Sequence, residues 1–374
     1  MRNVIFAGGG TGGHLYPALA LGAALQERDP QIRVHYVGAR RGVETRVLPA
    51  QGVPHTLLPL QPIQRDRVWR NWRLVPAMTG TVFGLAGLFR RLRPSLVVGT
   101  GGYASGPACM WGVLAGVPVA LQEQNSYPGF TTRLLSRWAR QVHLGFPEAA
   151  RHLRPGRRTQ ILSLGNPIRP PDPALDRLAS RRAFGLTVDG VVLLVVGGSQ
   201  GARAVNETLA GALEAVARGD LAARPAGLEI MWATGPAHID HVRGRLDALG
   251  LDWVHAHGYI DDMPAALAAA DIAVTRAGAM ATAELLAWGR PMLLVPLPTA
   301  AADHQTHNAR ALDEAGAGVM LLERDLTPEL LWREVVSLAG DHERRARMTA
   351  AARERAHPDA ARDIAGHLHS LVSP

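Results

Sequence analysis

The chain contains no lysine and only one cysteine. All 40 of its permanently cationic residues are arginine. With Cys109 alone, no internal disulfide can form, which fits a reducing compartment. Aromatic residues make up only 5% of the chain, so its interior must be built mainly from leucine, valine and alanine. A small disulfide-stabilised fold is therefore excluded.

Long apolar runs are missing as well. No segment reaches the roughly 20 consecutive apolar residues that cross a bilayer. The first apolar run, Val4–Ala7, is too short for a signal peptide and leads into glycines rather than a cleavage site. We therefore expect a cytoplasmic protein that begins at or near Met1.

The length of 374 residues and the hydrophobic content of 47% suffice for two domains with separate cores. Short apolar runs alternate with helix-like segments, which is typical of a parallel sheet covered by helices. Pro17–Arg28 is expected to be a helix with proline in its first position. The expected strands are Val4–Ala7, Arg33–Val37, Leu96–Val98, Val117–Leu121, Val191–Val196, Leu228–Trp232, Ile272–Thr275 and Met292–Val295.

A proline-rich segment, NPIRPPDP at residues 166–173, joins two halves of the chain that begin with the same pattern. Each half begins with a strand and a glycine-rich turn, Ala7–His14 in the first and Val196–Ala202 in the second. This pattern predicts an α/β protein of two doubly wound domains that face each other across a cleft. We expect the first domain at 1–165 and the second at 166–357, with a C-terminal helix from about residue 358 able to pack back on the first.

Glycine-rich turns follow three of the expected strands, at Gly8–Gly13, Gly99–Tyr103 and Gly197–Gly201. Glycines bring backbone N–H groups close to a ligand, and a following helix N-terminus favours phosphate. Because such turns occur in both halves, they indicate two phosphate-bearing substrates rather than one bound cofactor.

An NAD(P)-dependent oxidoreductase is the main alternative, since Gly8–Gly13 contains the pattern G-x-G-x-x-G. Such an enzyme needs an acid at the end of the second strand to hold the ribose. Here the strand ends in Val37–Arg41, with no acid before Glu44. An arginine there suits a 2′-phosphate, so this alternative stays open, as does a tight turn without a ligand.

The segment Asp271–Glu284 predicts a diphosphate site. Its strand ends near Thr275, and a helix begins at Ala279 after a glycine turn. The free N–H groups of the first helical turn can hold a diphosphate, and Glu284 can accept hydrogen bonds from ribose hydroxyls. The alternative is an ordinary exposed helical glutamate.

The segment Asp303–Ala309 carries amide side chains, which suit sugar hydroxyls because each offers a donor and an acceptor. Its two histidines, His304 and His307, have a spacing that also occurs in metal sites. No acidic or cysteine cluster completes such a site, so we expect no metal.

Positive charge is concentrated in the first half of the chain, while the net charge is +8. Arg65–Arg93 and Arg133–Arg158 are both rich in arginine and nearly free of acids. This favours an anionic partner. Within the first stretch, Trp69–Pro94 is apolar and flanked by tryptophan and arginine, which suits a membrane headgroup interface. A buried helix with basic ends is the alternative. The sequence contains no basic motif interleaved with aromatic residues, so we expect no nucleic-acid partner.

Taken together, these segments resemble the MurG family, the UDP-N-acetylglucosamine transferases that convert lipid I to lipid II in peptidoglycan synthesis. The resemblance runs in family order from Gly8 to Ala309. It rests on the strings GGGTGGHLYP, GTGGYASGP, EQN, GNPIR, GGSQGAR, GYIDDM, RAGAMATAE and DHQTHNA.

The resemblance implies a GT-B fold, no metal, no bound cofactor and a donor site in the second domain. It implies that the backbone of Ile260 reads the uracil, that Ala279–Glu284 take the diphosphate and ribose, and that Gln305 contacts the sugar. The other implied donor contacts are Arg169 and Ser199. The individual positions of the diphosphate segment are Ala279, Met280, Ala281, Thr282, Ala283 and Glu284. On the first domain the implied substrate-binding positions are Thr11, Gly12, Gly13 and Asn125.

The family inverts the anomeric centre, which implies one displacement assisted by a general base. Our candidate is His14, because a helix N-terminus disfavours the imidazolium form. A purely structural role in the glycine turn is the alternative, and Glu123 is the second candidate base. The charge of the leaving UDP is expected to be met by helix N-termini and Arg169. One departure is Gln122, where the family commonly has histidine, so no residue titrates there.

The resemblance also implies the partners: UDP-N-acetylglucosamine, a lipid-linked muramyl-peptide acceptor and an anionic membrane surface, with no nucleic acid. The expected location is the cytoplasmic face of the cell membrane, bound peripherally. UDP-N-acetylglucosamine 2-epimerases and natural-product glycosyltransferases share the fold and remain alternatives.

Overall fold

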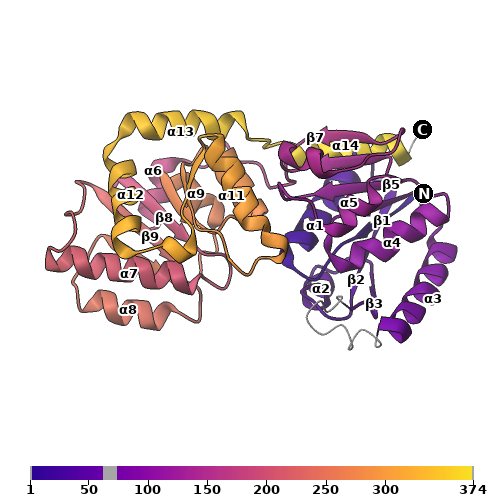
Figure 1. Ribbon diagram of the computed structural model, residues 1–374, viewed down its shortest axis with the longest axis horizontal. Coiled ribbons are helices and arrows are strands. Elements are labelled where there is room, and N and C mark those ends of the chain that lie inside the picture. The colour runs from indigo at the N-terminus through magenta and orange to yellow at the C-terminus, as the bar shows by residue number, and fades with distance from the viewer. Residues whose placement is uncertain (1, 62–73, 373–374) are drawn as a thin grey trace. The chain divides into compact units, whose positions relative to one another are not determined.

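The computed structural model describes residues 2–61 and 74–372 of the chain. They form two compact units, one of Met1–Arg169 with His357–Pro374 and one of Pro170–Ala356. Each unit is built on one parallel sheet with helices against it (Figure 1). The predicted class, α/β with two doubly wound domains, is confirmed.

The first unit has a seven-stranded sheet in the order β3-β2-β1-β4-β5-β6-β7. Its strands are β1 Arg2–Ala7, β2 Ile32–Ala39, β3 His55–Leu58, β4 Leu96–Gly99, β5 Val119–Glu123, β6 Gln141–Leu144 and β7 Gln160–Ser163. Its helices are α1 Gly12–Arg28, α2 Glu44–Ala50, α3 Leu74–Leu92, α4 Gly102–Leu114, α5 Phe130–Leu135, the 3-10 helix η2 Pro147–His152 and α14 Ala360–Val372.

Both faces of this sheet are buried, as its continuous apolar strands require. Along β1, Val4 and Phe6 pack with α1 and α14, whereas Ile5 and Ala7 pack with α3, α4 and α5. The helix α14, which follows the second unit in sequence, therefore belongs to the core of the first, where it packs against α1.

The second unit has a six-stranded sheet in the order β10-β9-β8-β11-β12-β13. Its strands are β8 Val191–Val196, β9 Leu228–Ala233, β10 Val254–His257, β11 Ile272–Thr275, β12 Met292–Leu294 and β13 Gly318–Met320. Its helices are α6 Arg177–Ala183, α7 Arg203–Arg218, α8 Ile239–Asp247, α9 Met263–Ala269, α10 Ala279–Ala287, α11 His304–Glu314, α12 Pro328–Gly340, α13 His342–Glu354 and the 3-10 helices η3 Ala301–Asp303 and η4 Glu323–Asp325.

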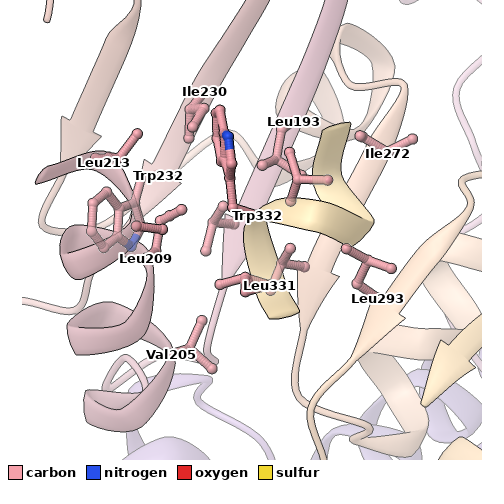
Figure 2. Packing of buried hydrophobic residues seen from close by; sticks show 14 of the residues in the cluster. Leu193, Val205, Leu209, Leu213, Ile230, Trp232, Ile272, Leu293, Leu331 and Trp332 are labelled. Carbon is pink, nitrogen blue, oxygen red and sulfur yellow. The ribbon is translucent and has the colours of Figure 1, made fainter. Parts of the chain in front are cut away.

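Two tryptophans anchor the core of the second unit (Figure 2). Trp232 of β9 and Trp332 of α12 are almost fully buried among leucine, valine and isoleucine side chains. Each buried indole N–H has an acceptor, Asn206 Oδ1 at 3.0 Å and the Ala222 carbonyl at 2.7 Å respectively. These two tryptophans are the largest fully buried side chains among the described residues.

The helix expected at Pro17–Arg28 begins five residues earlier, so the predicted start was wrong. The amides of His14 and Leu15 close the first turn on the Thr11 carbonyl. The sequence did not indicate this first turn, because it begins with Gly12 and Gly13 and glycine has low helix propensity. Pro17 therefore lies inside the helix rather than at its first position.

All eight predicted strands are present, with ends that differ by up to two residues. Five further strands were not predicted: β3, β6, β7, β10 and β13. Each is only three or four residues long, and most carry histidine, glutamine, serine or threonine. Short strands with polar residues give no continuous apolar run to recognise.

Candidate functional site

The glycine turns lie where doubly wound sheets bind ligands. Strand order reverses between β1 and β4 in the first unit and between β8 and β11 in the second. At such a switch point the connections diverge and leave room beyond the carboxyl ends of the strands. Turns at residues 8–11, 100–101, 197–202 and 276–278 follow these four strands. Each unit therefore has one candidate site.

In the first unit the two glycine turns interlock. A Cβ on Gly8 would lie 2.0 Å from Thr100 Oγ1, and a Cβ on Gly102 would lie 2.1 Å from the Gly9 carbonyl oxygen. Gly102 also has φ of 73°, a conformation that side-chain residues rarely adopt. Glycine is required here because the backbones approach closely. The alternative of a tight turn without a ligand therefore accounts for part of this motif.

His14, in the first turn of α1, has a defined tautomer. Its Nδ1 lies 3.1 Å from Gln124 Oε1. The Gln124 amide is oriented because its Nε2 donates to the carbonyls of Thr100 at 3.0 Å and Gln122 at 3.1 Å. Oε1 must therefore accept, so His14 carries its proton on Nδ1. That leaves Nε2 as a proton acceptor, which a general base requires.

Glu123, the second candidate base, is engaged in holding a loop. One carboxylate oxygen accepts from the backbone and side-chain N–H groups of Asn125 at 3.2 and 3.3 Å. The other accepts from the Gly129 amide at 3.0 Å. The carboxylate is almost fully buried. This geometry favours a positioning role for Glu123 and leaves His14 as the better base.

Glu44 is a residue that our reading of the sequence missed. It opens α2, is fully buried, and accepts from the amides of Gly10 at 3.0 Å and Ala39 at 2.9 Å. The carboxylate of Glu44 thus binds, as an internal anion, to part of the first glycine turn. With its carboxylate turned inward, Glu44 does not serve as the ribose acid of an NAD(P) enzyme. Its sequence distance from Gly10 gave no signal.

The remaining predicted positions of the first unit differ in exposure. Thr11 is exposed, and Gly12 and Gly13 form the first helical turn, whose N–H groups are available to an anion. Gln122 is buried and donates to the Gly165 carbonyl at 3.4 Å, so it supports the segment before the Pro-rich joint. Arg169 is exposed at the end of this unit.

In the second unit the turn after β8 packs on the turn after β9. A Cβ on Gly201 would lie 1.9 Å from the Thr234 carbonyl oxygen, and Gly201 has φ of 76°. Asn206 donates to the same carbonyl at 2.7 Å. Ser199 is exposed at the tip of this turn. Ile260 is buried, so only its main chain can face a ligand.

Helix α10 begins at Ala279, as predicted; its N-cap residue Gly278 supplies no side-chain cap, and its first turn carries no acid. Its first N–H groups are therefore suited to a diphosphate. Thr282 is buried and donates to the Gly278 carbonyl at 3.1 Å, so it shapes the turn. Met280, Ala281 and Ala283 are half-buried.

Glu284 lies on the second turn of α10 and is half-buried. Burial raises the pKa of its carboxyl group to about 7. Within residues 2–61 and 74–372 the carboxyl group of Glu284 has no hydrogen-bond partner. A desolvated carboxyl group without a donor suits a ligand that brings hydroxyl groups.

The segment at the start of α11 is tied to these elements. Gln305 Oε1 accepts from the Leu297 amide at 3.0 Å, and the buried Asn308 donates to the Ala277 carbonyl at 3.1 Å. Two non-glycine residues before the helix, Ala302 and Asp303, have positive φ of 52° and 54°. Such backbone strain is concentrated at functional sites.

Arg276, between β11 and α10, is a second residue that the sequence did not single out. It donates to the carbonyls of Val295 and Pro296 at 3.2 and 3.3 Å and pairs with Glu323 at 2.5 Å. It therefore links the diphosphate segment to the loop after β12, whose Leu297 amide in turn bonds to Gln305. Among the described residues no group of three His, Cys, Asp or Glu side chains is arranged for a metal.

Two family models match the chain. Residues 4–144 match the glycosyltransferase family 28 N-terminal domain, and residues 192–364 match its C-terminal domain.

Similar proteins share most of their length with this chain. A UDP-N-acetylglucosamine--N-acetylmuramyl-(pentapeptide) pyrophosphoryl-undecaprenol N-acetylglucosamine transferase of Moorella thermoacetica is 41% identical over 365 residues, which is 96% of this chain and 95% of that protein. The protein of the same name from Chlorobium luteolum is 40% identical over 375 residues, 99% of each chain.

Solved structures agree in fold. MurG of Acinetobacter baumannii superposes with a TM-score of 0.79 and 28% identity, covering 99% of this chain and 100% of that one. A putative UDP-N-acetylglucosamine 2-epimerase of Listeria monocytogenes has a TM-score of 0.68 at 15% identity, covering 100% and 96%. The second likeness concerns the fold alone.

Proposed function

The chain belongs to glycosyltransferase family 28, among its MurG transferases, and from this premise we propose how its residues carry out the reaction. It is a hexosyltransferase that moves N-acetylglucosamine from UDP-N-acetylglucosamine to a lipid-linked muramyl-peptide acceptor, the conversion of lipid I to lipid II in peptidoglycan synthesis. The observation that carries this conclusion is the 41% identity to a transferase of that name over nearly the whole of both chains.

The second unit holds the donor. The amides of the first turn of α10 meet the diphosphate charge, with Ser199 at the neighbouring turn. Glu284 accepts from the ribose hydroxyls, the Ile260 main chain reads the uracil, and Gln305 contacts the sugar. What supports these roles is that Glu284 is a desolvated acid and that Gln305 is held by the Leu297 amide.

The first unit supplies the base. His14 Nε2 takes the proton from the acceptor hydroxyl while that oxygen bonds to the anomeric carbon of the donor. The bond from that carbon to the UDP oxygen breaks, and UDP leaves with the electron pair, so one displacement inverts the centre. Thr11, Gly12, Gly13 and Asn125 bind the acceptor. The Nδ1–H tautomer imposed by Gln124 supports this role of His14.

Three neighbouring helices of the first unit expose apolar side chains. Helix α4 packs against both α3 and α5. Phe83 of α3 is 73% exposed, and Leu114 at the end of α4 is 76% exposed. Further exposed apolar residues on α3, on α5 and just after it are Met78, Val82, Phe130, Leu134 and Trp138.

This apolar surface has exposed arginines beside it at the end of α3, Arg90 and Arg91, and after α5, Arg137. Apolar side chains bordered by cations suit the headgroup layer of an anionic membrane. The protein thus binds the cytoplasmic face of the cell membrane peripherally, where its acceptor is anchored. No described helix has the length and apolar content for a bilayer crossing. Of the predicted membrane segment Trp69–Pro94, residues 69–73 lie outside the described residues, as do residues 65–68 of the arginine-rich stretch that precedes them.

A transfer assay tests the function directly. Purified protein is incubated with radiolabelled UDP-N-acetylglucosamine and a lipid-linked muramyl-peptide acceptor, and NMR determines the anomeric configuration of the new bond. We expect acceptor-dependent incorporation with inversion. Epimerised UDP-sugar formed without acceptor, and no transfer when acceptor is present, would contradict the proposal.

A further inference from the structure

The second unit contains a cavity of about 580 Å³ that the transferase reaction does not use. It lies between α13 and the segments that lead into β8, β11 and β12, at Gly190, Asp271 and Arg290. These are the amino ends of the strands. The turns assigned to the donor follow the carboxyl ends of the same strands. The cavity therefore lies at the opposite ends of these strands.

The cavity wall is strongly cationic. Four arginines line it, Arg177, Arg290, Arg345 and Arg353, with a single carboxylate, Asp271. That carboxylate is already neutralised, because it pairs with both Arg177 and Arg181. It also accepts from the Val192 amide at 2.8 Å.

Three of the lining arginines have no carboxylate partner among the described residues: Arg290, Arg345 and Arg353. Arg290 donates to the carbonyls of Leu267 and Ala268 at 3.0 and 3.2 Å, which fixes its guanidinium in place. Burial lowers its pKa to about 10, Asp271 opposes this lowering, and the neighbouring arginines add to it. The four arginines of the wall therefore carry more positive charge than its one carboxylate offsets.

The guanidinium group of Arg345 is also held in position. It donates to the Leu338 and Ala339 carbonyls at the end of α12, at 2.5 and 2.6 Å. Arg353 is exposed, and its side chain lies against Gly289, where an added Cβ would come within 2.9 Å of its Nε. Fixed, planar guanidinium groups match phosphate oxygens in pairs, and the volume lies in the range of small-molecule sites.

We propose that this cavity binds a soluble phosphate-bearing anion, a diphosphate or a phosphorylated small molecule, at a site separate from the donor site. Arg345 and Arg353 bind the phosphate oxygens, and Arg290 supplies charge from the base of the cavity. The proposal does not depend on the transferase reaction, because it is tested by direct binding.

Calorimetric titration of the full chain with inorganic pyrophosphate, with and without saturating UDP, tests the proposal. We expect one site per chain that persists when UDP is present. R353Q and the double variant R345Q/R353Q should weaken binding about tenfold or more, as loss of a charge-assisted hydrogen bond predicts. The control R324Q/R333Q removes two exposed arginines of the same unit outside the cavity and should bind like the parent.

Thermal unfolding and UDP binding verify that each variant is folded. Complete loss of pyrophosphate binding in the presence of UDP would place the anion at the donor end and overturn the proposal. Equal binding by R345Q/R353Q and the parent would overturn it as well. So would failure to bind pyrophosphate while R345Q/R353Q lowers binding to phosphatidylglycerol vesicles, because the arginines would then serve lipid headgroups.

Discussion

At the scale of single residues, the state of His14 follows from its neighbour. Gln124 fixes Nδ1 as the donor, so the ring offers Nε2 to the acceptor substrate. H14A should lower turnover by about 10²–10⁴-fold, the contribution of general base catalysis. Donor affinity should change little. Initial rates with the full lipid acceptor measure this.

Two further variants sharpen the test of His14. Q124A removes the hydrogen bond that selects the tautomer, so it should lower kcat more than it raises KM. H369A replaces a histidine of the same unit that contacts Asp29 at 3.3 Å and should leave turnover unchanged. Near-normal turnover of H14A would give His14 a structural role and turn attention to Glu123.

Glu284 should make donor binding depend on pH. Its pKa is raised to about 7, so the carboxyl group is mainly protonated below pH 7 and ionised above it. Ribose hydroxyls donate best to the ionised form, so UDP affinity should rise between pH 6 and 8, with proton release on binding. Calorimetry in buffers of different ionisation enthalpy measures both.

Removing this carboxylate gives the matched test. E284A should weaken UDP-sugar binding by about 1.5–3 kcal/mol, the range for a hydrogen bond to a charged group. E284Q should abolish the pH dependence of the affinity. A pH-independent affinity in the parent, or unchanged binding by E284A, would remove Glu284 from the donor site.

Glu44 should contribute to stability rather than to donor binding. E44A leaves the amides of Gly10 and Ala39 without their acceptor inside the protein. We expect the free energy of unfolding to fall by about 1–3 kcal/mol for each unsatisfied amide. Urea unfolding measures it, and E44Q, which keeps an acceptor, should recover part of the loss. Parent-like stability of E44A would mean that water replaces the carboxylate.

At the scale of the elements, α3 is apolar on two sides. Its inner face, with Leu85 and Leu88, is buried in the core of the first unit, while Phe83 is exposed. The alternatives of a buried helix and an interfacial one are therefore combined in one element. Arginine at an anionic surface contributes about 1 kcal/mol per residue, and this attraction weakens with salt.

Vesicle sedimentation separates the two contributions of α3. Replacing Arg90, Arg91 and Arg93 by glutamine should weaken binding to anionic vesicles without altering UDP-N-acetylglucosamine binding. F83S should reduce the fraction that resists salt. The control R324Q/R333Q/R347Q removes equal charge from the second unit. Equal vesicle binding by the α3 triple variant and the parent would show that another surface brings the enzyme to its acceptor.

At the scale of the whole molecule, the chain returns to the first unit for its last helix. Ile364 and Leu368 of α14 are fully buried in the core that includes β1 and α1. L368A should destabilise the first unit by about 2–5 kcal/mol through the cavity it leaves. Scanning calorimetry with UDP present, which stabilises only the unit that binds it, assigns the transition. A shift confined to the UDP-stabilised transition would contradict this.

The sequence by itself determined the fold class and the location of both candidate sites. Buried parallel strands are continuous apolar runs, so β1, β4, β8 and β11 were recognisable, and the glycines that follow them mark the carboxyl ends. These are properties of short segments. The start of α10 at Ala279 is local in the same way, because it depends on the preceding glycine turn.

Tertiary structure alone decided the state of the individual side chains. The tautomer of His14 depends on a glutamine 110 residues away, and the glycine turn at Gly10 is bonded to a carboxylate 34 residues away. The arginine cavity gathers residues from α6, α13 and the segments before β8, β11 and β12. The local pattern of a sequence indicates which face of a segment is buried. It does not indicate which distant group a side chain contacts. The hydrogen bonds and charge of that side chain are therefore determined only when the chain has folded.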